Sequence, residues 1–177
     1  FKYDFINKPL VNLWAEEIKK ILLNRYPNLE VTTNKYRYVP TIDIDVAYAH
    51  LGRKFKIIIG SYLLALSKLK FSYLAEKTLT LLRLVKDKYD TYDYQQTLFK
   101  KYNLHPVYFL LAAGSRSKYD KNISTNSRRF SMLVKKLAKY ADIGIHPSYQ
   151  SHNHPEIVES DIKRLEKPLE KKIKASR

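Results

Sequence analysis

Two carboxylates, Asp43 and Asp45, lie two residues apart in a stretch rich in β-branched and aromatic residues. Side chains at positions i and i+2 of a strand point to the same face, so both carboxylates are expected on one side of it. If that strand is buried, such a pair is costly unless a cation or a proton compensates it. The alternative is an edge strand whose polar face meets water while Ile42, Ile44 and Val46 face the core.

A histidine follows another short apolar run near the end of the chain. His146 precedes Pro147, Ser148 and Tyr149, a stiff turn that would hold an imidazole at the end of a strand. A lone histidine is more often a capped or core residue than a ligand. Together with two carboxylates at an equivalent strand end, however, it indicates a metal site. The chain contains no cysteine, so His, Asp or Glu must supply the ligands.

Hydrophobic periodicity places these residues in an alternation of strands and helices, which predicts the α/β fold class. Helices are expected over about 9–26, 60–85 with a break near 70–72, 90–102, 127–140 and 155–167, and strands over 36–49, 107–113 and 142–146. Trp14 is expected to anchor the first helix to the core, and Pro168 to stop the last one.

Strands that alternate with helices pair in parallel, and the chemistry of such folds sits at the carboxyl ends of the strands. The polar residues expected there are Asp43, Asp45 and His50 after the first strand, 115–120 after the second and 146–154 after the third.

The charge is strongly positive, with 33 Lys and Arg against 17 Asp and Glu, a formal net charge of +16. Such a balance attracts phosphate backbones, anionic lipids or acidic glycans without choosing among them. Most lysines are scattered beside apolar helix positions, as on solvated faces. Nucleic-acid binding ranks lowest because no recognition helix or single basic face stands out.

No apolar run approaches the ~20 residues of a membrane-spanning helix. The apolar and basic first half of the helical stretch 60–85 could, however, lie on a membrane surface instead of in the core.

Four short segments, in this order, resemble successive blocks of a bacterial branch of the polysaccharide deacetylase (NodB-homology) family, which is related to carbohydrate esterase family 4. They are Pro40-Thr41-Ile42-Asp43-Ile44-Asp45, Asp90-Thr91-Tyr92-Asp93-Tyr94, Ser117-Lys118-Tyr119-Asp120 and Gly144-Ile145-His146-Pro147-Ser148-Tyr149. The resemblance implies a distorted (β/α) barrel, a divalent metal that is often zinc, and hydrolysis of N- or O-acetyl groups on a polysaccharide or cell-surface glycan.

The resemblance also implies roles for individual residues. In the family motif Thr-Phe-Asp-Asp the first Asp is the general base and the second binds the metal. Asp43 matches the base, whereas Ile44 stands at the metal-binding position, so that Asp45 becomes the candidate ligand.

In the family motif His-Ser/Thr-x-x-His both histidines bind the metal. His146 matches the first and Gln150 stands at the second. His152 and His154 are close enough to substitute as ligands, and Ser148 and Tyr149 are possible substrate contacts.

The chain is therefore expected to comprise an N-terminal helical extension, 1–34, and the N-terminal part of a deacetylase-like barrel domain, 35–177. The second part is expected to be truncated, because a full (β/α) barrel has about 250 residues. Ala175-Ser176-Arg177 is the candidate start of the family's Arg-bearing segment. Two functions are expected: a metal-dependent carbohydrate deacetylase or, because Ile44 and Gln150 depart from the motifs, a non-catalytic glycan- or surface-binding module on the same fold.

Overall fold

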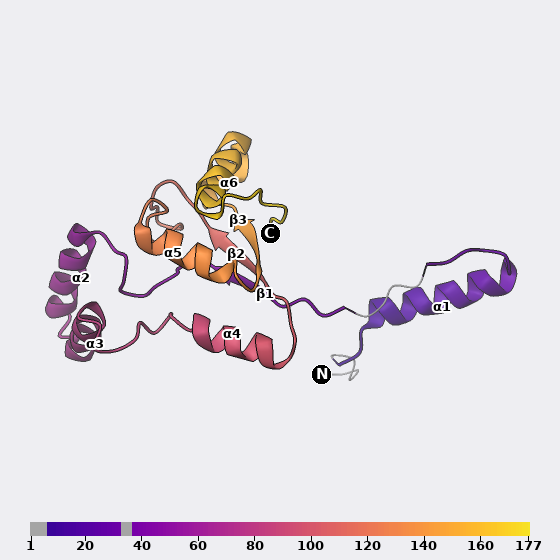
Figure 1. Cartoon of the computed structure of the whole chain (residues 1–177), viewed down its shortest axis with the longest axis horizontal. Helices are drawn as coiled ribbons and strands as arrows, with labels where there is room; N and C mark the ends of the chain where they lie inside the picture. Colours follow the sequence, from indigo (N-terminus) through magenta and orange to yellow (C-terminus); the bar gives the residue numbers. More distant parts are fainter. Residues whose placement is uncertain (1–6, 33–36) are drawn as a thin grey trace. The chain divides into compact units, whose positions relative to one another are not determined.

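The computed structural model describes residues 7–32 and 37–177 (Figure 1). The chain divides into two compact units, Phe1–Arg37 and Tyr38–Arg177.

The described residues of the first unit form one helix, α1 (Leu10–Arg25), where the sequence predicted it. It ends before Tyr26-Pro27, since a residue that precedes proline disfavours helical backbone angles. None of the helix residues is buried, and Trp14 is 61% exposed. Within the described residues of this unit, Trp14 does not anchor a core as predicted. An amphipathic pattern specifies an apolar face, but it does not supply the surface that covers this face.

The second unit is built on a parallel sheet, which confirms the α/β class. Its strands are β1 (Thr41–Ile44), β2 (Val107–Leu111) and β3 (Asp142–His146), in the order β1-β2-β3. The register aligns Asp43 with Phe109 and Phe109 with Gly144. Within the described residues this sheet has three strands and does not close into a barrel.

Helices occupy the connections between the strands and the segment that follows β3. They are α2 (Phe55–Ser67), α3 (Phe71–Leu81), α4 (Tyr92–Lys101), α5 (Arg128–Leu137), the short 3-10 helix η1 (Tyr149–Asn153) and α6 (Pro155–Leu169). The break expected near 70–72 is confirmed by the end of α2 and the start of α3. Helix α5 begins at a Ser127 cap, whose hydroxyl accepts a hydrogen bond from the Phe130 amide (3.2 Å).

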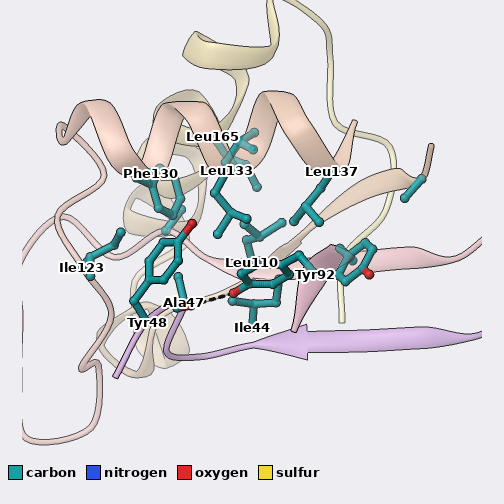
Figure 2. Packing of buried hydrophobic residues seen from close by; sticks show 14 of the residues in the cluster. Ile44, Ala47, Tyr48, Tyr92, Leu110, Ile123, Phe130, Leu133, Leu137 and Leu165 are labelled. Atoms are coloured by element: carbon teal, nitrogen blue, oxygen red, sulfur yellow. Dashed lines mark hydrogen bonds between the residues drawn. The ribbon is translucent and has the colours of Figure 1, made fainter. Parts of the chain in front are cut away.

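One face of the sheet packs against helices and forms the core. Ile44 and Leu110 face Phe130, Leu133 and Leu137 of α5 (Figure 2). Helices α4 and α6 add further side chains to the same cluster, Tyr92, Phe99 and Leu165. The Tyr92 hydroxyl also donates a hydrogen bond to the Ala47 carbonyl (2.7 Å), which ties α4 to the loop after β1.

The predicted strand 36–49 is much shorter in the structure, and its first residue, Tyr36, lies outside the described residues. β1 ends at Ile44 because the backbone amides that follow bond to side chains from distant loops. The Ala47 amide donates to Asn122, and the Ala49 and His50 amides donate to Asp87. The second strand also ends earlier than predicted, at Leu111.

The last helix does not stop at Pro168 as predicted. Pro168 is buried inside α6, which continues to Leu169. Because the proline lies in the final turn, few hydrogen bonds are affected by its missing amide. Glu170, with φ of 56°, then ends the helix in the left-handed conformation, and its amide donates to the Glu166 carbonyl (2.8 Å).

The C-terminal residues run alongside β3. The Ile145 amide donates to the Ala175 carbonyl (2.9 Å), and the Arg177 amide donates to the Ile145 carbonyl (3.2 Å). Gly144 permits this close arrangement, because a Cβ there would lie 2.6 Å from ring carbons of Phe109 and 3.0 Å from the Ala175 carbonyl oxygen. The chain end is thereby brought to the side of the sheet that carries Asp43.

Candidate functional site

The carboxyl edge of the sheet brings Asp45 and His146 together. Asp45 directly follows β1, and His146 is the last residue of β3. The Asp45 Oδ1 atom lies 3.5 Å from His146 Nε2. The other ring nitrogen, Nδ1, lies 3.1 Å from the Pro147 carbonyl oxygen. Residues that are 101 positions apart in the sequence (45 to 146) thus meet because parallel strands end at the same edge.

The two carboxylates are more exposed than a buried strand would make them. The side chain of Asp43 is 35% exposed and that of Asp45 is 66% exposed, while Ile44 between them is buried in the core. Of the two alternatives for this strand, the structure shows the edge strand whose polar face meets water, so burial supplies no argument for a cation at this pair. The case for a site must rest on the partners of these carboxylates.

Asp43 has a basic partner from the far end of the chain. The Nη1 atom of Arg177 lies 3.6 Å from Asp43 Oδ1 and donates a hydrogen bond to the Thr41 hydroxyl (2.8 Å). The guanidinium therefore spans two side chains on one face of β1. Nothing in local periodicity predicts this contact. The resemblance to an Arg-bearing family segment was the one sequence signal that pointed to Arg177.

The turn after His146 is fixed by a buried carboxylate. Asp161 of α6 is fully buried, accepts a hydrogen bond from the Ser148 amide (3.3 Å) and pairs with Arg164 (2.7 Å). The Ser148 carbonyl accepts a hydrogen bond from the Ser151 hydroxyl (2.7 Å). Ser148 is itself buried, so it positions the turn and is not placed to contact a substrate.

Two exposed tyrosines stack beside this turn. The rings of Tyr119 and Tyr149 are 4.0 Å apart between centroids, with 27° between their planes. Buried Asp120 joins their loops, because its Oδ1 accepts from the Tyr149 amide (2.9 Å) and its Oδ2 accepts from the Ser117 hydroxyl (3.0 Å). Periodicity alone did not predict this pairing, although both tyrosines lie in the blocks that carry the family resemblance.

His152 and His154 are exposed and line the same open hollow as His146, Gln150 and Arg177. His152 belongs to η1, and His154 Nδ1 bonds to Glu156 Oε1 (3.0 Å). Neither histidine joins Asp45 and His146 in a ligand cluster. Among residues 7–32 and 37–177, no three His, Asp or Glu side chains are grouped closely enough to hold a metal ion.

The loop after β1 is held by Asp87. Its carboxylate accepts hydrogen bonds from the amides of Ala49 (2.9 Å), His50 (2.8 Å), Leu51 (3.1 Å) and Tyr89 (3.0 Å). Burial favours the neutral form, but these four amides outweigh it and hold the pKa of Asp87 below its ordinary value. His50, expected among the strand-end polar residues, is buried and bonds through Nε2 to Glu76 of α3 (3.0 Å). His50 is therefore a structural residue.

A second His and Asp pair provides a comparison. His105 Nε2 lies 3.3 Å from Asp142 Oδ2 at the amino edge of the sheet, and both side chains are exposed. Proximity of an imidazole and a carboxylate is thus not specific to the candidate site. Two features distinguish the carboxyl edge from the amino edge. Asp43 and Arg177 form a further pair there, and a neighbouring hollow is lined by His152 and His154 as well as His146.

The donors at the carboxyl edge match a divalent metal in kind. Zinc takes imidazole nitrogen and carboxylate oxygen, and a catalytic zinc has three protein ligands. Asp45 and His146 could supply two such donors. A third would have to come from a side chain that approaches this pair, and His152 and His154 line the same hollow.

Comparisons with known proteins yield no relative of this chain: no family model, curated protein or solved structure matches it. None of the helices in the described part of the chain is long and apolar enough to cross a membrane.

Proposed function

We propose that this chain belongs to a metal-dependent hydrolase that removes N- or O-acetyl groups from a polysaccharide or cell-surface glycan. The observation that carries the proposal is the meeting of two pairs at one sheet edge, Asp43 with Arg177 and Asp45 with His146. The order of the four resembling segments along the chain supports it. The proposal includes the finer architecture, in which the three strands are part of a distorted (β/α) barrel.

Asp43 is the proposed general base. Its carboxylate accepts a proton from the attacking water while the water oxygen forms a bond to the acyl carbon. The bond from that carbon to the sugar nitrogen or oxygen then breaks, and the leaving atom recovers the proton, which gives acetate and a free amine or hydroxyl. Arg177 balances the negative charge of Asp43 and, through Thr41, holds the carboxylate in one orientation. Arg177 is therefore a positioning residue.

Asp45 and His146 are the residues that would hold the metal. When bound, a divalent ion such as zinc polarises the acyl carbonyl and lowers the pKa of water. The Pro147 carbonyl near Nδ1 leaves Nε2 of His146 directed at Asp45. His152 is the first candidate for a third ligand, because His154 is engaged by Glu156.

A glycan substrate accords with the aromatic side chains beside the site. Tyr149 lines the same hollow as His146, Tyr119 stacks on Tyr149, and both tyrosines are exposed. Sugar rings offer apolar C–H faces together with hydroxyls, and tyrosine matches both features. Tyr149 is therefore proposed as a substrate contact, in place of buried Ser148.

The proposal is tested by acetate release from N-acetylated glucosamine oligomers with zinc present. The wild-type chain should release acetate, and Asp43→Asn should lower the rate by about 100-fold or more, as loss of a general base does. Asp142→Asn is the matched control, since it alters an exposed carboxylate at the opposite edge of the sheet. Equal rates in the two variants would exclude Asp43 as the base.

The alternative is a glycan-binding module without turnover, favoured by the absence of a third ligand among the described residues. It predicts binding of the same oligomers in the presence of a chelator, with no acetate released at any zinc concentration. Tyr149→Ala should weaken that binding. Acetate release that depends on Asp43 would exclude this alternative.

A further inference from the structure

Helix α2 presents an apolar stripe to solvent. Phe55, Ile59, Leu63 and Leu66 lie at positions i, i+4, i+8 and i+11, which fall within about 80° of one another around a helix. All four are exposed, with Phe55 at 74% and Leu63 at 63%. The stripe is continued by Leu69 and Phe71 at the turn between α2 and α3, where Leu69 is 73% exposed. We call these six residues the α2 stripe.

The opposite side of α2 is the one that packs inside the protein. It faces α3, and the two helices lie side by side (Figure 1). Polar contacts join them: Lys77 of α3 donates to the Ser61 hydroxyl and to the Ile58 carbonyl (3.2 Å), and the Tyr62 and Thr78 hydroxyls share a hydrogen bond (2.7 Å). The inward side of α2 thus combines the small or apolar side chains of Ile58 and Ala65 with these hydroxyls, while its larger side chains, such as Phe55 and Leu63, face solvent.

The helix pair is joined to the rest of its unit by contacts with the loop after β1. His50, in the loop after β1, bonds to Glu76 of α3 and contacts the Tyr73 ring edge-on at 5.4 Å between centroids. Asp87, beyond the end of α3, binds three amides of that same loop. The α2 stripe is therefore exposed on a structured pair of helices, α2 and α3, which is joined to the loop after β1 through α3 and through Asp87.

The charges around the stripe have one sign. Between Val46 and Ala75 the sequence contains five basic residues and no Asp or Glu; the basic residues are Arg53, Lys54, Lys56, Lys68 and Lys70. They flank the two ends of α2, beside Phe55 and beside Leu69. An apolar stripe bounded by cations is complementary to a surface that has an apolar interior and anionic groups above it.

We propose that the α2 stripe binds the surface of an anionic lipid bilayer, with α2 lying in the plane of the interface. The apolar side chains enter the boundary between headgroups and acyl chains, and the four exposed lysines contact the anionic headgroups, while Arg53 donates to the Lys121 and Tyr48 carbonyls. Since α2 has only 13 residues, about 20 Å of helix, it lies on the membrane and does not cross it. This surface is separate from the carboxyl edge of the sheet and does not depend on the proposed hydrolase activity.

The test uses single cysteines, because the chain has none of its own. Leu63→Cys and Met132→Cys are each labelled with an environment-sensitive fluorophore and mixed with phosphatidylcholine vesicles with and without phosphatidylglycerol. Met132 of α5 is the matched control, at 61% exposure against 63% for Leu63. We expect the label at position 63 to shift to the blue with anionic vesicles, and the label at position 132 to remain unchanged.

Charge variants test whether basic residues beside the α2 stripe contact the anionic headgroups. Replacing Lys54 and Lys56 by glutamine should weaken binding to anionic vesicles about fivefold for each lysine. The same change at Lys100 and Lys101 on α4 should have little effect. The proposal is overturned if neither label responds to vesicles, if both respond equally, or if phosphatidylcholine alone suffices. The proposal is also overturned if the emission of the label at position 63 shifts to the blue without lipid as the protein concentration rises. That result would assign the stripe to binding of a second copy of the chain.

Discussion

Asp87→Asn tests how the loop after β1 is held. The wild-type carboxylate accepts hydrogen bonds from four backbone amides, two on each oxygen. An asparagine of the same shape keeps one oxygen and turns the other position into a donor, so two amides lose their acceptor in either orientation of the side chain. An unsatisfied buried donor costs about 1–3 kcal/mol, so the expected destabilisation is about 3 kcal/mol.

The assay is thermal unfolding followed by circular dichroism at neutral pH. A loss of about 3 kcal/mol should lower Tm by about 6–12 °C in a chain of this size. Asp93→Asn is the control, because Asp93 is exposed and pairs only with surface lysines. It should change the free energy of unfolding by less than about 1 kcal/mol.

The pH dependence gives the same prediction a second test. The folded pKa of Asp87 is lowered, so its contribution to stability is present above the unfolded pKa and is lost as the pH falls through the folded value. The gap in Tm between wild type and Asp87→Asn should therefore be constant above about pH 5 and narrow below about pH 4. A gap that is absent at neutral pH, or constant into acid, would refute the assignment of Asp87 as the anchor of this loop.

Two further substitutions test the packing of the sheet. Gly144→Ala places a Cβ against the Phe109 ring and should cost about 1–3 kcal/mol in urea unfolding, whereas Gly60→Ala, with nothing within 4 Å in α2, should stabilise by about 0.5–1 kcal/mol. Equal effects would contradict the close approach at Gly144. Leu133→Ala removes a buried side chain of α5 and should cost about 2–5 kcal/mol, while the exposed neighbour Met132→Ala should stay within about 0.5 kcal/mol. If the Met132 variant were the less stable, the orientation of α5 would be wrong.

Sequence periodicity predicted the elements well where local signals are strong. Strand 142–146 was placed correctly, and α6 begins at Pro155 as expected, because proline is favoured at the first helical position. The end of β1 was missed because it depends on Asn122 and Asp87, which lie far along the chain. The exposure of Trp14 was missed because periodicity marks an apolar face without its partner.

The candidate site was predictable only in part. Parallel strands that end at one edge explain why Asp45 and His146 meet, and this follows from topology. The contact between Arg177 and Asp43 does not follow from the order of the strands, because it depends on how the final residues run beside β3. Burial of Ser148 and stacking of Tyr119 on Tyr149 depend on contacts made by Asp161 and Asp120. Such contacts carry no periodic signal in the sequence.

Zinc titration is the most direct test of the carboxyl edge as a metal-dependent site. Isothermal titration calorimetry of the wild-type chain should show one zinc site, weakened at least about tenfold by His146→Gln, the low end of what metal-site substitutions cost. His105→Gln is the matched control, because His105 forms the corresponding pair with Asp142 at the amino edge. We predict that this control binds zinc as the wild type does. An equal loss of zinc affinity in both histidine variants, or no zinc binding by the wild type, would contradict the assignment of Asp45 and His146 as metal ligands.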